Sequence, residues 1–179
     1  MHRVFKADLS QKGIEKLIKD LRNYQQVTLP NRCRELVTRL AEIGIQTAKV
    51  QIDKSQLGHY ISIKTDISPE VMGFKAILIA TGETFTSDEY NDFNTLLAIE
   101  FGAGIHYNPL PNPYSYSTGF GVGSFPGQIH AFEDGWHYWD EESQSWKYTH
   151  GVKATMPMFE ARVEMVNKLK KIAKEVFSK

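Results

Sequence analysis

Three stretches of the chain repeat apolar side chains with the period of an amphipathic helix. In the first, Ser10 offers an N-cap, and apolar residues follow at i, i+3, i+4 and i+7. The second begins near Thr28, with a proline in its first turn, and runs to about Val50, whereas the third begins after Thr155. The apolar positions are Ile14, Leu17, Ile18 and Leu21 in the first; Cys33, Leu36, Val37, Leu40, Ile43, Thr47 and Val50 in the second; and Phe159, Val163, Val166, Leu169, Ile172, Ala173 and Val176 in the third.

Between the second and third helices the pattern is that of strands. Residues 61–67 alternate apolar with polar side chains, which predicts a half-buried strand. Residues 68–70 (Ser-Pro-Glu) predict a turn. The nearly continuous apolar run over residues 71–80 predicts a central strand covered on both faces, and residues 96–101 predict another buried strand.

These elements predict an α+β fold with N-terminal amphipathic helices, a small antiparallel sheet carrying a long loop excursion, and a C-terminal helix. No internal repeat is visible, so we expect residues 1–179 to form a single domain, with the excursion over residues 102–134. The chain has no apolar run of membrane-spanning length and no apolar centre of a secretory signal near its start. We therefore expect a soluble protein, intracellular when made, with no membrane partner.

The excursion is unusual in its composition. Residues 102–132 contain no Lys, Arg, Asp or Glu, although an average composition would place about seven or eight there. The segment is too rich in proline and glycine for a helix and longer than usual connections. Its aromatic residues argue against simple disorder, so we expect another surface to order it. The interface candidates are Glu100, Phe101, Gly102, Tyr107, Tyr114, Tyr116, Phe120, Phe125 and Phe132.

Charge is balanced over the whole chain but unevenly distributed along it. Residues 1–54 contain eleven basic and six acidic side chains, residues 55–152 contain three and twelve, and residues 153–179 contain seven and three. Proteins that grip nucleic acid draw most of their affinity from Lys and Arg on the phosphates. The acidic middle therefore argues against nucleic-acid binding in that region.

The residues that carry chemistry form no recognisable catalytic pattern. A lone cysteine, Cys33, excludes an intrachain disulfide framework and a multi-cysteine zinc site, and its place on a helix register favours an inert core thiol. Four of the six histidines lie in the excursion and the segment after it, but without a spacing typical of zinc ligands. The glycines at 119, 121 and 123 lack the flanking strand and helix of a phosphate loop. We expect no metal, no cofactor and no enzymatic activity.

Residues 135–139 and 145–149 predict a β-hairpin with aromatic cross-strand pairs. This hairpin contains all three tryptophans of the chain: Trp136, Trp139 and Trp146. Packing in the core or at a subunit interface is favoured for them, because platforms that stack nucleic-acid bases need a positive groove, whereas this region is acidic. The alternative is a small hydrolase or carbohydrate-binding protein, with the tryptophans as a platform and Glu133 and His137 as acid and base. A toxin-type or regulatory binding module is a further alternative, for which the sequence offers no positive sign.

Two segments carry a resemblance to a known family. Residues 98–104 (AIEFGAG) end a predicted strand, and residues 151–161 (GVKATMPMFEA) open the last helix. They resemble the tail-completion, or head-to-tail connector, proteins of long-tailed bacteriophages, in which E-[FY]-G and G-x-x-A-x-P-[FM]-[FM]-x-x-A recur at these places. The order of helices and strands is also similar to that of the family.

The resemblance implies a structural virion protein that forms a ring at the phage neck, with six subunits expected. Its implied partners are other copies of itself, other neck or tail proteins, and DNA that passes through without specific binding. The implied location is the virion, and the host cytoplasm during assembly. An uncharged aromatic excursion suits the centre of a ring contact. Glu133, Asp134 and Asp140 are candidates to face the channel, where like charge would repel DNA from the wall.

Overall fold

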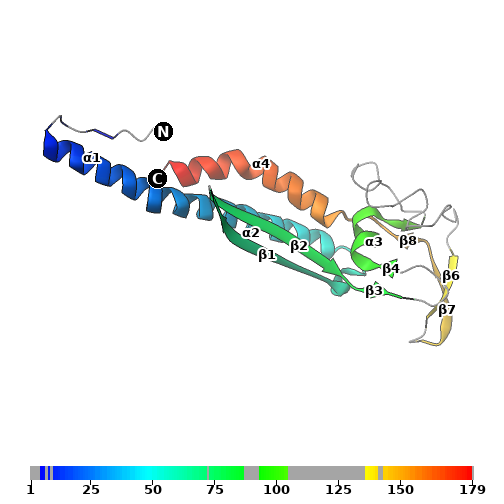
Figure 1. Ribbon diagram of the computed structural model, residues 1–179. Coiled ribbons are helices and arrows are strands. Elements are labelled where there is room, and N and C mark those ends of the chain that lie inside the picture. The colour runs from blue at the N-terminus through cyan, green and yellow to red at the C-terminus, as the bar shows by residue number, and fades with distance from the viewer. Residues whose placement is uncertain are drawn as a thin grey trace.

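The computed structural model describes residues 5, 6, 8, 10–71, 73–86, 93–104, 136–140 and 143–178. The elements follow one another as α1 (Gln11–Asn23), a π-helix (Tyr24–Thr28), α2 (Leu29–Ile52), a 3-10 helix (Gly58–Tyr60), β1 (Ile61–Glu70), β2 (Gly73–Gly82), β3 (Thr84–Phe85), β4 (Phe93–Asn94), α3 (Thr95–Phe101), β5 (Ala103–Gly104), β6 (Trp136–Asp140), β7 (Ser145–Thr149), β8 (Gly151–Val152) and α4 (Pro157–Phe177). The expected α+β class is confirmed: the described chain has helices toward both of its ends and antiparallel strand pairs between them (Figure 1).

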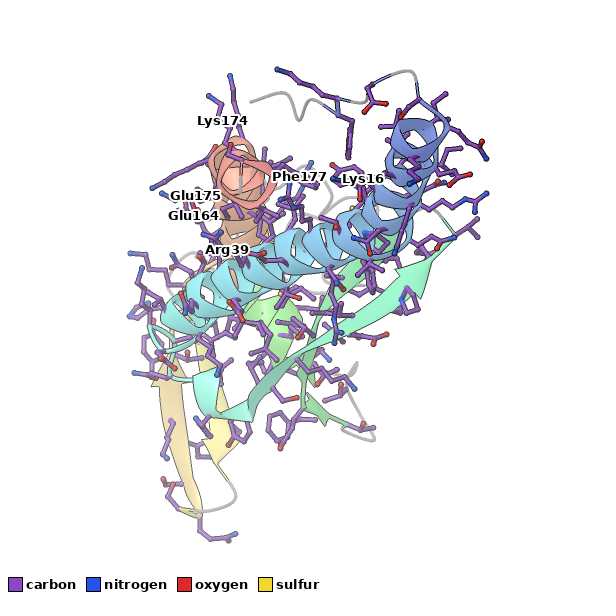
Figure 2. The ribbon with its side chains drawn as sticks, turned by 90° about the vertical axis from the view of Figure 1, so that its left-hand side faces the viewer. Lys16, Arg39, Glu164, Lys174, Glu175 and Phe177 are labelled. Carbon is purple, nitrogen blue, oxygen red and sulfur yellow. The ribbon has the colours of Figure 1, made fainter. Side chains whose placement is uncertain are left out.

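Helix α2 is the middle layer of the body. Helix α4 lies along one side of it and the β1–β2 ribbon along the other, as Figures 1 and 2 both show. The two helices run antiparallel: near the start of α2, the Arg32 guanidinium donates to the Phe177 carbonyl at 3.2 Å. Further along α2, Arg39 Nη2 lies 2.5 Å from the Glu175 carboxylate, and Figure 2 shows the two side chains between the helices.

The most deeply buried positions of α2 are small residues. Ala41, Gly44 and Ala48 are buried, while the larger apolar residues predicted to face the core are only partly covered or exposed. A Cβ atom built on Gly44 would lie 2.8 Å from Met165 Sδ of α4 and 3.2 Å from Leu78 Cδ2 of β2. Because α2 is packed from two sides, small side chains at the junction let both neighbours approach its backbone closely.

Helices α1 and α2 form one continuous helical rod, which the sequence pattern treated as two separate helices. The predicted start of the second helix is correct, since α2 begins at Leu29 with Pro30 in its first turn. A π-helix fills the junction, and the Leu29 amide donates to the Tyr24 carbonyl five residues earlier. In a regular helix the proline ring would clash with the carbonyl four residues before it, and the wider π turn relieves that clash.

The predicted N-cap of α1 is confirmed. The Ser10 hydroxyl accepts a hydrogen bond from the Gly13 amide at 3.1 Å. Asp8 supports this cap by accepting bonds from the Ser10 hydroxyl and from the Ser10 amide, the latter at 2.8 Å. These two bonds, the hydroxyl's first, lower the pKa of the exposed Asp8 carboxyl below its usual value.

The β1–β2 ribbon differs from the sequence prediction in two ways. The turn expected at residues 68–70 is wrong, because β1 continues to Glu70 and Pro69 pairs with Phe74. A proline fits there because both strands of a two-stranded ribbon are edge strands. The expectation that residues 71–80 are covered on both faces is also wrong: one face lies toward α2, and Ile77 on the other is 40% exposed. The predicted alternation of β1 is confirmed.

Replacing Gly44 tests the packing of the three layers. We expect Gly44→Val to lower the free energy of unfolding by about 1–3 kcal/mol, because the added methyl groups overfill the space between Met165 and Leu78. Gln46→Val introduces the same β-branched side chain at an exposed position of α2 and should cost about 0.5 kcal/mol or less. Urea denaturation followed by circular dichroism measures both. Equal losses in the two variants would contradict the close approach at Gly44.

Candidate functional site

The two segments that flank the excursion meet in the structure. Strand β5 follows α3 directly and pairs antiparallel with β8, so that Ala103 lies opposite Val152 and Gly104 opposite Gly151. The chain therefore leaves the body at residue 104 and returns to it at residue 151 through one closed base. This base, formed by α3, β5, β8 and the start of α4, is the candidate site (Figure 1).

The first element of this base, α3, is a helix, so the strand predicted for residues 96–101 is wrong. The Asn94 side chain caps α3 by accepting a hydrogen bond from the Leu97 amide at 3.1 Å. The Thr95 hydroxyl donates to the Glu83 carbonyl at 3.0 Å, which attaches the helix to the end of the ribbon. The burial predicted for the segment is correct, because most of α3 is buried. A six-residue apolar run does not distinguish a short buried helix from a buried strand.

Gly102 ends α3 and directs the chain into β5. Its backbone has φ 79° and ψ 168°, a conformation that is essentially restricted to glycine. The residue is buried, as are Phe101 before it and Ala103 after it. The E-F-G motif thus combines a buried acid, a buried aromatic ring and a turn that requires glycine.

Glu100 holds the first turn of α4. Its side chain is buried, with the residue only 6% exposed, and its two carboxylate oxygens accept hydrogen bonds from the amides of Met158 at 2.9 Å and Phe159 at 3.0 Å. The first amides of a helix have no partner within the helix, and the helix dipole favours a negative charge beside them. Glu100 therefore acts as the N-terminal cap of α4, although it lies 58 residues away from Met158 in the chain.

The residues just before α4 complete the junction. The amides of Thr155 and Met156 both donate to the Ile99 carbonyl, at 2.8 and 3.1 Å. Met156 occupies the N-cap position in a left-handed conformation (φ 50°, ψ 51°) and makes no side-chain capping bond with the described residues. The carboxylate from α3 takes over the role that a local Ser, Thr, Asp or Asn usually has.

The structure assigns an internal role to part of the predicted interface set. Glu100, Phe101 and Gly102 lie in the interior of the chain itself, so little of their surface remains for a partner. The backbone of Asp140 pairs with Ser145 at the end of the hairpin. The other candidates lie outside the described residues, and their roles remain predictions: Tyr107, Tyr114, Tyr116, Phe120, Phe125, Phe132, Glu133 and Asp134.

The predicted aromatic hairpin is confirmed. Strand β6 pairs antiparallel with β7, with Trp139 opposite Trp146 and His137 opposite Tyr148. Trp146 is 67% exposed and Tyr148 is 48% exposed, so neither belongs to the core of the chain. The hairpin lies beyond α3, at the end of the molecule opposite α1 (Figure 1).

An open depression lies at the end of the ribbon, lined among others by His59, Tyr60, Ser62, Thr81 and Glu83. The Ser62 hydroxyl lies 2.6 Å from the Thr81 hydroxyl, so each oxygen has a hydroxyl partner rather than a catalytic base. Within the described part of the chain, no group of three or more His, Cys, Asp or Glu residues is arranged to bind a metal. Nor does any helix there combine the length and apolarity needed to cross a membrane.

Replacing the buried carboxylate tests the junction. We expect Glu100→Gln to lower the free energy of unfolding by about 1–3 kcal/mol, because one helix amide loses its acceptor and meets an N–H group instead. Hydrogen exchange at Met158 and Phe159 should also become faster. Glu160→Gln removes a charge from the same helix end without touching this cap, and should cost about 0.3–1 kcal/mol. Unchanged exchange at both amides in Glu100→Gln would contradict the proposed cap.

Comparison of the chain with protein-family models, curated proteins and solved structures found no match. The site is therefore defined by its own geometry: a buried acid, a glycine turn and a pair of short strands close the base of a long excursion. Its residues position a segment of chain.

Proposed function

We propose that the protein is a structural subunit of the neck or tail of a bacteriophage or prophage, which forms a ring that completes the tail or joins it to the head. One observation carries the proposal. The two motif segments that resemble the tail-completion family, residues 98–104 and 151–161, form a single hydrogen-bonded junction. Two motifs so far apart in the chain are expected to occur together in a family when the segments that carry them build one structural unit.

The shape of the molecule supports an architectural role. The body is elongated, with α1 projecting at one end and the hairpin and the base of the excursion at the other (Figure 1). Both ends carry exposed apolar or aromatic side chains, including Ile18 on α1 and Trp146 on the hairpin. Contacts at two separate ends are what a subunit needs to join neighbours and a second ring or tail component.

The uncharged excursion is the proposed contact with a neighbouring subunit or with another neck or tail protein. Interface centres are rich in Tyr, Trp and Phe and poor in most charged residues, which is the composition of residues 102–132. The closed base brings residues 103–104 and 151–152 together, so the whole stretch that contains this segment starts and ends at one place on the body.

A genetic experiment tests the function. In a phage or prophage that encodes the chain, we expect deletion of its gene to yield heads and tails that are not joined, as counted by electron microscopy of lysates. The full-length chain should restore complete particles, and gold-labelled protein should lie at the neck. Complete, infectious particles made without the protein would overturn the proposal.

A shortened chain tests the role of the excursion separately. Residues 106–134 are replaced by a short Gly-Ser linker, which leaves Glu100, β5 and β8 in place. We expect the melting temperature of the purified body to change by only a few degrees, since the base stays closed, while complete particles are not restored. A shortened chain that supports normal particle yield would show that the excursion makes no required contact.

Charge reversal tests the proposed channel. If Glu133, Asp134 and Asp140 face passing DNA, their replacement by lysine should attract the polymer and slow its passage. We expect assembled particles that retain their DNA after adsorption, measured by a potassium-efflux or DNA-release assay. A failure to assemble would instead place these residues in a subunit contact, and normal DNA release would contradict the channel role.

A further inference from the structure

Helix α1 has an apolar face that the described part of its own chain leaves partly exposed. Ile14, Ile18 and Leu21 are each 43% exposed, and none of the residues of α1 is buried. Among the described elements, α1 packs closely only against the adjoining π-helix. Near the N-terminus, Phe5 contacts the ring of Tyr24, three residues beyond Leu21 at the end of this face, with centroids 5.7 Å apart. A helix of this length is marginal without packing on its apolar face.

The apolar stripe of helix α4 is wider than the part that packs on α2. Ala161, Ile172 and Val176 are buried in the α2–α4 seam. Val163, Val166 and Leu169 continue the same stripe at three-residue intervals, from Leu169 beside this seam to Val163 on the side turned away from α2, and they are 37%, 63% and 44% exposed. These three residues are called the outer face of α4 below. Its exposed aliphatic side chains are of the same kind as those of α1.

We propose that the apolar face of α1 (Ile14, Leu17, Ile18 and Leu21) packs on the outer face of α4 of a second copy of this chain. The occupant is a second copy because the α1 helix extends beyond the C-terminal end of α4 in the same chain (Figure 1). The α4 helix of the same chain therefore does not run beside the apolar face of α1. The contact deepens the proposed function, since it names the surfaces that would join neighbouring subunits of the ring.

The charges at the edges of the two faces are complementary. On α1, Glu15, Asp20 and Arg22 border the apolar face, which gives the border a net negative charge, whereas the lysines lie on the opposite side of the helix. On α4, Lys170 and Lys174 lie next to the outer face, on the side turned away from α2; Figure 2 shows Lys174 there. A net acidic border on one helix and a basic border on the other favour pairing of α1 with α4 and disfavour pairing of two α4 helices.

The contact is heterologous, because it joins two different surfaces. Each copy offers one α1 face and one α4 face, so each copy can bind a neighbour at both surfaces. Repetition of such a contact closes into a ring when the rotation between neighbours permits it. Heterologous contacts have a property that isologous ones lack: a copy with a damaged α1 face still has an intact α4 face.

Complementation between two variants tests this contact. Ile18→Asp places a charge in the α1 face, and Val166→Asp places one in the outer face of α4. We expect each full-length variant alone to be monomeric in analytical ultracentrifugation, with self-association weakened by more than about 30-fold relative to the unmodified chain. An equimolar mixture should form a heterodimer and nothing larger, because only one intact pair of faces remains.

Matched controls separate the contact from folding and from charge. Lys19→Asp lies next to Ile18 on the lysine-bearing side of α1, and Asn167→Asp lies next to Val166 on an exposed part of α4. Both should assemble as the unmodified chain does. All four variants should keep the circular dichroism spectrum of the unmodified chain, since every substituted side chain is exposed. Changing Glu15 and Asp20 to Lys should weaken association, and so should changing Lys170 and Lys174 to Glu. A chain that carries all four changes should associate again, because the charges of the two faces are exchanged.

Three results would overturn the contact: an unmodified chain that stays monomeric at millimolar concentration, a Val166→Asp variant that associates normally, or a mixture that forms no heterodimer. Normal association of Val166→Asp with loss in Ile18→Asp would mean that α1 binds a second α1. The proposed function is tested by a different measurement, and it fails if complete, infectious particles form without the gene. Heterodimers together with normal particles from the deletion would therefore refute the neck role and leave the contact standing.

Discussion

The hydrogen bonds between the buried Glu100 carboxylate and the first amides of α4 are the interaction on which the layout of the molecule depends. They hold the start of α4 against α3, and α4 then runs back along α2. The same junction places β8 beside β5 and closes the base of the excursion. Burial of a carboxylate is costly, but two amide donors and the positive end of a helix offset that cost. A charged residue in an otherwise apolar segment thus positions the segment that we propose to make contacts.

Small side chains form a large part of the interior of the body. Within the described residues, alanines are half of the buried apolar positions, and the larger ones are Ile52, Ile99, Phe101, Ile172 and Val176. This permits α2 to be packed from two sides but leaves many large aliphatic residues partly exposed on α1 and α4. Exposed apolar faces of this kind usually mark interaction surfaces. The distribution of burial therefore agrees with a subunit that completes its packing in an assembly, as proposed for the α1–α4 contact.

Local patterns predicted the local elements well. The cap at Ser10, the start of α2 near Pro30, the alternation of β1 and the aromatic hairpin are all found. The errors arose where an apolar run was short or its partners were unknown. Residues 96–101 form a helix, and Asn94 before it and Gly102 after it were the available start and stop signals. The run over residues 71–80 belongs to a ribbon of two strands, so its second face has no sheet or helix of this chain to cover it within the described part.

What the sequence determined by itself is local: the periods of the helices, their caps, the hairpin and the uncharged composition of residues 102–132, since each depends on neighbouring residues. The role of Glu100 was decided only by the tertiary structure, because a carboxylate can cap a helix 58 residues away only after α3 and α4 have packed together. The choice of buried face on α4 was decided there as well. Its sequence carries one broad apolar stripe, and the approach of α2 at Gly44 buries one edge of that stripe and leaves the other exposed.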